Sequence, residues 1–235
     1  MKRNIGKNVE LLKDIGKVDS KINSVLIISL ISIVLTDLVF NNLPELFSGA
    51  SGLLNAYYNF CIGIVVSYIF YFFVVHLKEQ SDKLNIQPYV LKKSQNIVAN
   101  HDDVIGKLKK LSGDSSPEKF LTKNDIEAVF KSINPMATAP MTLGLGGAAA
   151  NWLQYMDSRR YYTEEKIGKV FKLMPHLDTE LAQILSAIED CSYFVSLKHT
   201  ANRELPNNKD LIPWAEPFYE YSQLCKSLEK YYEAL

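Results

Sequence analysis

The sequence predicts an all-α protein with a two-helix transmembrane hairpin followed by a cytoplasmic helical domain. Two long apolar stretches predict the hairpin, because residues 22–77 carry only two formal charges, Asp37 and Glu45. In the rest of the chain, apolar residues recur at spacings of three and four, which indicates amphipathic helices. No alternating apolar run is long enough to predict a strand. The expected parts are a basic segment at 1–21, the hairpin at 22–77 and the helical domain at 78–235.

Each apolar stretch is long enough to cross a membrane as a single helix. A span needs roughly 20 apolar residues, because the hydrocarbon core is about 30 Å thick and a helix rises 1.5 Å per residue. Residues 22–43 and 53–77 meet this length, and the second stretch contains no charged residue. Its tyrosines lie toward its two ends, as interfacial aromatic residues do. A pair of buried core helices is a poor alternative for runs of this length.

Positive residues around the two stretches predict the orientation of the hairpin. The link at 44–52 has no Lys or Arg, whereas cations flank the hairpin on both sides: Lys2, Arg3, Lys7, Lys13, Lys17, Lys21, Lys78, Lys83, Lys92 and Lys93. Because positive loops stay in the cytoplasm, we expect both termini there, in a bacterial inner membrane. A cleaved signal peptide is the alternative, but the segment before the apolar run is long and Asp37 interrupts that run.

Small and polar residues within the two stretches predict where the membrane helices pack. Ser29, Ser32 and Thr36 share one face of the first predicted helix, and Gly63 and Ser67 share one face of the second. Such stripes let helix backbones approach closely in lipid. They join either the two helices of one hairpin or the hairpins of a homo-oligomer, and the sequence leaves both arrangements open.

Asp37 is the one carboxylate inside a predicted span. Carboxylates within membranes are candidates for a functional role, because burying their charge in lipid is costly. One interpretation is that Asp37 lines the polar interior of an oligomer. The other is that it reaches headgroups or water beside Asn41 and Asn42, close to the outer boundary.

The helical domain is expected to contain a series of amphipathic helices. The first covers residues 90–111 and is opened by Pro88. His101 lies on its apolar stripe, where a histidine is more often a hydrogen-bonded packing residue than a ligand. Residues 116–118 resemble a helix start, with a serine cap and a proline at the first position. The remaining expected helices are 122–133 with a capping box of Thr122 and Asp125, one of about 25 residues capped by Asp178, and a last one from Trp214.

One interval of the helical domain has an unusual composition. Residues 132–156 contain no charge and are rich in Pro, Gly and Ala. A glycine-rich loop that enters a helix presents free N–H groups to an anion, and two arginines follow this one. The candidate site for a phosphate-bearing ligand therefore contains Gly144, Gly146, Gly147, Arg159 and Arg160. Two alternatives stay open: close helix packing beside a solvated arginine pair, and a loop that dips into the membrane.

Composition argues against several functions. Residues 78–235 contain 20 Lys and Arg against 21 Asp and Glu, so they offer no electrostatic footprint for duplex nucleic acid. Cys61, Cys191 and Cys225 are widely spaced, which indicates buried reduced thiols rather than disulfides or a zinc site. The histidines lack the motifs of nucleophilic or metal-dependent catalysis. We therefore expect no enzyme activity, metal or cofactor.

Two functional hypotheses follow from this plan. The first is an oligomeric membrane effector or signalling subunit. Its helical domain would sense a ligand, for instance a nucleotide second messenger, or a partner, and would alter the assembly of the hairpins. Bacterial antiviral defence effectors that permeabilise membranes share this plan, which is an analogy of architecture alone. The second is a membrane-anchored scaffold for a partner protein, without ligand sensing. Two helices cannot enclose a pore, so only the first hypothesis requires an oligomer.

Overall fold

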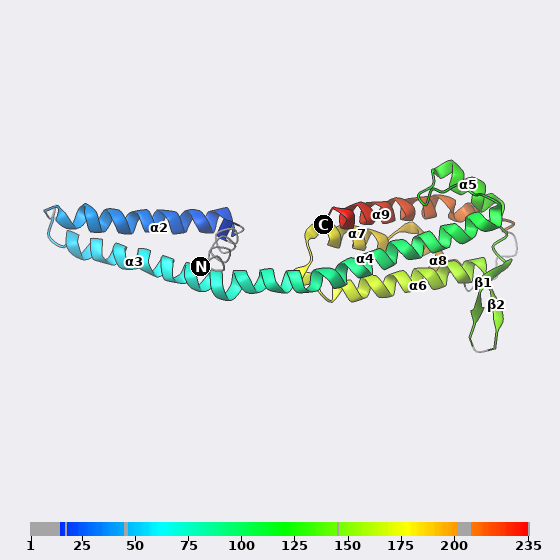
Figure 1. Cartoon of the computed structure of the whole chain (residues 1–235), viewed down its shortest axis with the longest axis horizontal. Coiled ribbons are helices and arrows are strands. Elements are labelled where there is room, and N and C mark those ends of the chain that lie inside the picture. Colours follow the sequence, from blue (N-terminus) through cyan, green and yellow to red (C-terminus); the bar gives the residue numbers. More distant parts are fainter. Residues whose placement is uncertain (1–14, 17, 45–46, 145, 202–207, 235) are drawn as a thin grey trace, which may run out of the picture. The chain divides into compact units, whose positions relative to one another are not determined.

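The structure of the chain is a computed structural model that describes residues 15–16, 18–44, 47–144, 146–201 and 208–234. It is mostly helical, as the sequence predicts. The chain divides into two compact units, Met1–Asn85 and Ile86–Leu235, and each is described by itself (Figure 1). Most of the predicted basic segment lies outside the described residues, including Lys2, Arg3, Lys7, Lys13 and Lys17.

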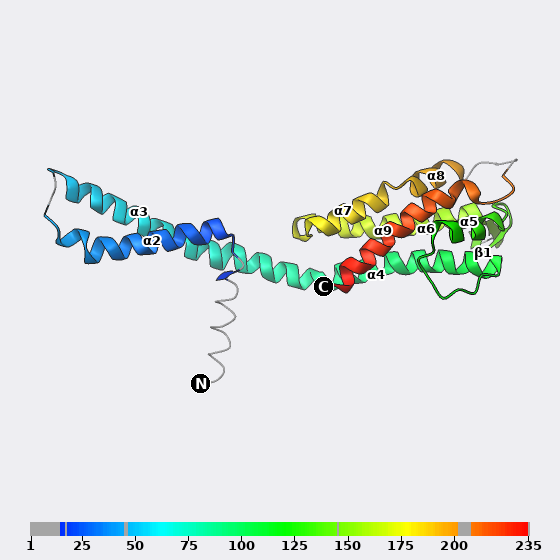
Figure 2. The same cartoon turned by 90° about the horizontal axis from the view of Figure 1, so that it is seen from above.

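The first unit contains a helical hairpin whose arms match the two predicted stretches. Helix α2 covers Ser20–Leu38 and is followed by a 3-10 turn, η1, at Phe40–Asn42. Helix α3 covers Ala50–Phe70 and continues as a π-helical segment, η2, at Tyr71–His76. Helices α2 and α3 lie side by side in both views (Figures 1 and 2). Both arms are long and apolar enough to cross a membrane.

Hydrogen bonds between hydroxyl and amide side chains join the two arms of the hairpin. The hydroxyl of Tyr57 on α3 donates to Ser32 Oγ on α2 at 2.7 Å. Toward the other end, the hydroxyl of Tyr68 donates to Asn23 Oδ1, also at 2.7 Å. Tyr57 and Tyr68 thus pair with polar side chains of α2, while many large apolar side chains of both arms are exposed.

The second unit is a bundle of helices. Helix α4, at Leu77–Ser112, contains the boundary between the two units. The other helices are α5 at Lys123–Lys131, α6 at Trp152–Phe171, α7 at Thr179–Glu189, α8 at Ser192–Thr200 and α9 at Ala215–Glu233, with 3-10 turns η3 at Met174–His176 and η4 at Ile212–Trp214. Helix α9 packs against α5, α7 and α8, and α6 packs against α7 and α8.

An aromatic cluster forms the centre of this bundle. The ring of Phe218 on α9 is fully buried and lies 5.2 to 6.0 Å, centroid to centroid, from the rings of His101, Phe130, Tyr193 and Tyr221. These rings come from α4, α5, α8 and α9, so one contact group joins four helices. Aromatic side chains bury large areas and gain further from edge-to-face contacts, which makes this cluster a main source of stability.

Several predicted helix ends are confirmed. Thr122 and Asp125 form the expected capping box at the start of α5. Asp178 accepts a hydrogen bond from the backbone N–H of Leu181 and so caps α7. The last helix begins one residue after Trp214, and the apolar stripe predicted for it is buried from Trp214 to Leu228. Caps and stripes depend on residues close in sequence, which explains this agreement.

Two predicted helix starts are wrong. Pro88 does not open a helix, because it lies inside α4. An interior proline costs roughly 3 kcal/mol, and helix-forming residues on both sides continue the helix here regardless. Residues 116–118 are not helical. Asp114 accepts hydrogen bonds from the backbone N–H and the hydroxyl of Ser116, which hold this segment in a loop.

The long helix predicted from Asp178 is broken into α7 and α8. Cys191 between them has extended backbone angles, with φ −66° and ψ 150°. After the break, Tyr193, Phe194 and Leu197 are buried, whereas Val195, which lies on the predicted stripe, is 46% exposed. The break therefore rotates the buried face, a change that regular spacing cannot reveal.

A β-hairpin replaces the expected loop in the uncharged interval. Strand β1 covers Thr138–Leu143 and pairs antiparallel with β2 at Ala148–Asn151, with an irregularity in register between Thr138 and Thr142. The prediction that the chain contains no strand is wrong at this point. Alanine, proline and threonine in short runs do not alternate in polarity, so the strands leave no periodic pattern.

The aromatic cluster gives a direct test of the bundle. Truncation of Phe218→Ala should lower the free energy of unfolding by about 3–5 kcal/mol, because it leaves a cavity among four rings. Tyr161→Ala, at a site 67% exposed on α6, should change it by less than about 0.5 kcal/mol. Urea unfolding, followed by the fluorescence of the two buried tryptophans Trp152 and Trp214, measures both. Equal losses in the two variants would contradict the assigned core.

Candidate functional site

The three glycines of the predicted anion site lie in the turn of the β-hairpin. Gly144, Gly146 and Gly147 are exposed, and Gly144 and Gly147 have positive φ angles of 59° and 70°, which glycine adopts readily. Helix α6 is capped by Asn151, which forms a capping box with Gln154. The expectation that a glycine-rich loop enters a helix is therefore wrong, because β2 lies between the glycines and α6.

Both predicted arginines are paired with carboxylates. Arg159 forms an ion pair with Asp103 on α4, with 2.9 Å between nitrogen and oxygen. Arg160 is buried and pairs with Asp157 and Glu164 on its own helix. An anionic ligand would have to compete with these carboxylates, and the two guanidinium groups have different partners. Phosphate binding by the pair stays a prediction.

Asp103 is the centre of a polar cluster between α4 and α6. Its Oδ2 accepts hydrogen bonds from Lys107 Nζ at 2.9 Å and from the hydroxyl of Tyr155 at 2.8 Å, in addition to the ion pair with Arg159. Burial raises the pKa of Asp103, but these hydrogen bonds and the nearby positive charges lower it more, so its pKa lies below the ordinary value. The cluster favours the charged carboxylate and ties α4 to α6.

A serine, a histidine and an aspartate come together in the bundle. His101 Nε2 lies 3.0 Å from Ser222 Oγ, and His101 Nδ1 lies 3.0 Å from Asp102 Oδ1. No local pattern predicts this contact, because His101 and Ser222 are 121 positions apart. Ser222 is 1% exposed and His101 is fully buried between the rings of Phe120 and Phe218, so no substrate reaches the hydroxyl. The arrangement is a hydrogen-bonded packing contact, as predicted for His101.

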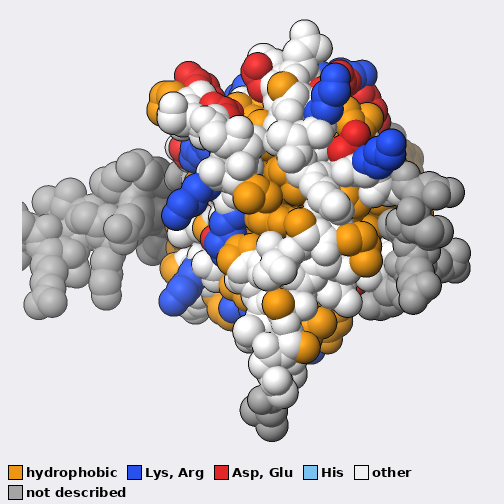
Figure 3. Space-filling view, turned by 90° about the vertical axis from the view of Figure 1, so that its right-hand side faces the viewer, with side chains coloured by type: hydrophobic (Ala, Val, Ile, Leu, Met, Phe, Trp, Pro, Cys, Tyr) orange, Lys and Arg blue, Asp and Glu red, His pale blue; other side chains and the backbone are white. Residues whose placement is uncertain are grey.

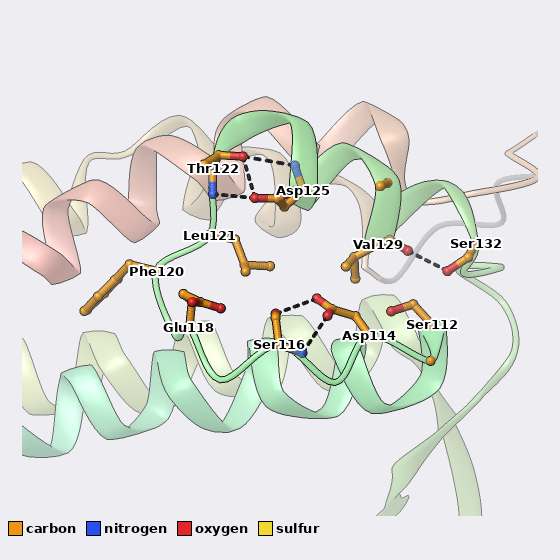
Figure 4. A pocket seen from close by; sticks show the side chains of 12 residues that line it. Ser112, Asp114, Ser116, Glu118, Phe120, Leu121, Thr122, Asp125, Val129 and Ser132 are labelled. Atoms are coloured by element: carbon orange, nitrogen blue, oxygen red, sulfur yellow. Dashed lines mark hydrogen bonds between the residues drawn. The ribbon is translucent and has the colours of Figure 1, made fainter.

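A cleft of about 690 Å³ lies beside this contact, between the end of α4, the loop 113–121 and α5 (Figure 4). The side chains of Asp114 and Glu118 point into it from the loop, and Leu121 and Val129 lie opposite them. Its twelve lining residues include three carboxylates, with Asp125 as the third, and no Lys, Arg or His. The cleft is thus acidic with an apolar side.

Two anchors hold the loop that forms the cleft. Lys109 is buried, and its ammonium group donates to the backbone carbonyls of Ser116 and Glu118. At the end of the loop, the ring of Phe120 stacks on His101, with 5.2 Å between centroids. A displacement of the loop would therefore change contacts in the aromatic core.

The chemistry of the cleft suits a small ligand with a cationic or hydrogen-bond-donating group. Clefts of this size bind small molecules through an apolar wall and a few directed polar groups. Three carboxylates give a negative potential that opposes a phosphate group. Among the described residues, no group of three or more His, Cys, Asp or Glu is placed to hold a metal ion.

The polar residues of the hairpin fall into two sets. Ser29 and Thr36 are buried within the hairpin, and Ser32 bonds to α3, so their stripe packs the two arms of one chain. Gly63 and Ser67 are exposed on a different face of α3. They are thus available to a partner outside the hairpin.

Asp37 is exposed near the C-terminal end of α2. Its Oδ2 accepts a hydrogen bond of 3.3 Å from the hydroxyl of Tyr58 on α3. The carboxylate is therefore linked to the neighbouring helix of the same chain. Whether it also lines an oligomer interior stays a prediction.

Comparison with known proteins gives no relative from which a function could be transferred. No family model matches the chain, and neither a search of curated proteins nor one of solved structures gives a significant match. The interpretation of these sites therefore rests on their geometry.

The Asp103 cluster predicts how stability depends on pH. Because the pKa of Asp103 is lower in the folded chain than the unfolded value of about 3.9, its contribution is present at neutral pH and is lost as the pH falls through the folded pKa. Asp103→Asn should lower the free energy of unfolding at pH 7 by less than about 1 kcal/mol, since the group is partly solvated. The difference from wild type should shrink toward pH 3.

Urea unfolding at several pH values measures this effect. Glu233→Gln, which removes an exposed carboxylate at the end of α9, is the matched control for the loss of one negative charge. A difference between Asp103→Asn and wild type that stays constant from pH 7 to pH 3 would show that the carboxylate charge does not join α4 to α6.

Proposed function

We propose that the hairpin anchors the chain in a membrane and that the helical domain is a sensing or binding module. The observation that carries this proposal is the exposed apolar surface of α2 and α3. Ile31 and Val66, near the middle of the two arms, are 54% and 59% exposed, and Phe70 is 64% exposed. Water-soluble proteins rarely expose continuous apolar surfaces of this extent, whereas lipid covers them without cost.

The proposed orientation has both termini in the cytoplasm. Its support is the asymmetry of charge, because Lys21 lies at the start of the first arm, Lys78 follows the second, and the link between the arms has no Lys or Arg. Anionic lipid and the translocation machinery retain such cations on the cytoplasmic side. The helical domain would then face the cytoplasm.

The proposed activity is that of a sensor and effector. The acidic cleft supports it, because a ligand there would contact the loop 113–121, whose Phe120 stacks on His101 in the aromatic core. Through that contact a ligand could alter the packing of α4 and α9. An effect on the membrane further requires several hairpins, since two helices enclose no pore, so the proposal includes a homo-oligomer.

A static scaffold is the second candidate, and one observation favours it. Strands β1 and β2 form an exposed hairpin in the uncharged interval 132–156, where Met136 is 47% and Leu143 38% exposed. Hydrophobic side chains gather on this end of the helical domain (Figure 3). Such a surface fits a protein partner. A scaffold requires no oligomer, so the particle mass distinguishes it from the effector.

Membrane insertion is tested by charges placed on the outer surface of the hairpin. Ile31→Arg combined with Val66→Arg should strongly reduce the membrane-inserted fraction, because one arginine at the centre of a span costs roughly 2.5–3.5 kcal/mol in insertion. The measurement is the fraction of protein that floats with vesicles and resists alkaline extraction.

The matched control places the same two charges on the helical domain. Tyr161→Arg combined with Val195→Arg alters side chains that are 67% and 46% exposed on α6 and α8. This variant should float as wild type does. If both double variants float equally, the apolar surface of the hairpin does not hold the chain in the membrane.

Orientation is tested by labelling of introduced thiols. Ser48→Cys in the link should react with a membrane-impermeant maleimide on intact cells, whereas Ser227→Cys on α9 should react only after permeabilisation. Both serines are exposed. The native thiols of Cys191 and Cys225 are buried, and burial raises the pKa of Cys191 to about 11, which keeps it protonated and unreactive. The reverse labelling would place the helical domain outside.

A further inference from the structure

A groove runs along the surface of the hairpin between α2 and α3. It has a volume of about 650 Å³, and its nine lining residues include Lys21 and no carboxylate. Gly63 and Ser67 form its open part, and a Cβ atom at Gly63 would meet no other atom within 4 Å. Phe60 and Tyr71 lie toward its two ends along the helix. The groove is therefore long, apolar and cationic at one end.

The length of the groove matches one leaflet of a bilayer. From Phe60 to Tyr71 a helix rises about 16 Å at 1.5 Å per residue. Half of the hydrocarbon core is about 15 Å. Lys21 lies in the first turn of α2, so in the proposed orientation it lies at the cytoplasmic interface, where anionic lipid headgroups concentrate.

We propose that this groove binds an acyl chain of an anionic phospholipid whose phosphate pairs with Lys21. The proposal rests on the proposed insertion of the hairpin in a membrane. The acyl chain contacts Gly63 and Ser67, where the absence of large side chains leaves room for it. The ammonium group of Lys21 complements the negative phosphate, and no carboxylate of the groove competes for it.

A second copy of the hairpin fits the groove less well. A helix segment about 10 Å across and 16 Å long occupies roughly 1,250 Å³, about twice the volume of the groove. The nine lining residues offer no carboxylate to Lys21, whereas a phosphate group supplies the opposite charge. An acyl chain with a phosphate at one end fulfils both requirements.

The experiment uses the full chain in vesicles made of equal amounts of phosphatidylglycerol and phosphatidylcholine. After flotation and solubilisation in a mild detergent, the lipid that stays with the purified protein is quantified, and the particle mass is measured by native mass spectrometry. Wild type should retain phosphatidylglycerol over phosphatidylcholine by about fivefold, the ratio expected for one lysine at an anionic lipid surface.

Two variants and two matched controls test the two parts of the site. Lys21→Gln should bring the ratio of the two lipids close to one, and Gly63→Leu should lower the total lipid retained without changing the number of chains in the particle. Lys78→Gln removes a flanking cation that does not line the groove, and Gly52→Leu adds the same bulk elsewhere on α3, where a Cβ also meets nothing within 4 Å. Both controls should retain lipid as wild type does.

Three results would overturn the proposal in distinguishable ways. If wild type floats but retains the two lipids equally, the lipid site is wrong and the membrane anchor stands. If Gly63→Leu lowers the particle mass and leaves lipid retention unchanged, a second copy occupies the groove. If wild type does not float at all, membrane insertion itself is wrong, and the lipid site fails with it.

Discussion

The outer surface of α2 and α3 is largely apolar. Burying a single leucine, isoleucine or phenylalanine side chain is worth roughly 1.5–3 kcal/mol, and the described part of the hairpin leaves more than a dozen such side chains exposed. Two pairs of polar side chains, by contrast, bond across the hairpin, Tyr57 with Ser32 and Tyr68 with Asn23. A hairpin with polar contacts inside and apolar side chains outside fits lipid, and the proposals on anchoring, orientation and lipid binding all depend on this distribution.

The helical domain has a connected interior that can link its surface cleft to its core. The loop 113–121 borders the cleft and is held by Lys109 and by the stacking of Phe120 on His101. His101 in turn contacts Phe218 and Ser222 on α9. A sensor needs such a continuous set of contacts between ligand and bundle.

The arginine pair and the cleft differ in the charge that they offer to a ligand. The arginines that pointed to a phosphate are already paired, Arg159 with Asp103 and Arg160 with Asp157 and Glu164. The cleft is lined by carboxylates and no cation. Two of the cleft's carboxylates also accept hydrogen bonds within the chain, Asp114 from Ser116 and Asp125 from Thr122, so among the described residues of the cleft Glu118 is the carboxylate for which the structure shows no such bond.

The sequence by itself determined the features that depend on near neighbours: the two apolar arms, the caps of α5 and α7, and the buried stripe of α9. Run length, side-chain caps and apolar spacing act over a few residues, so they can be read without the fold. Only the tertiary structure decided the break at Cys191, the β-hairpin, the contact of His101 with Ser222 and the acidic cleft. These depend on packing between segments far apart in the chain, whose contact energies leave no local pattern in the sequence.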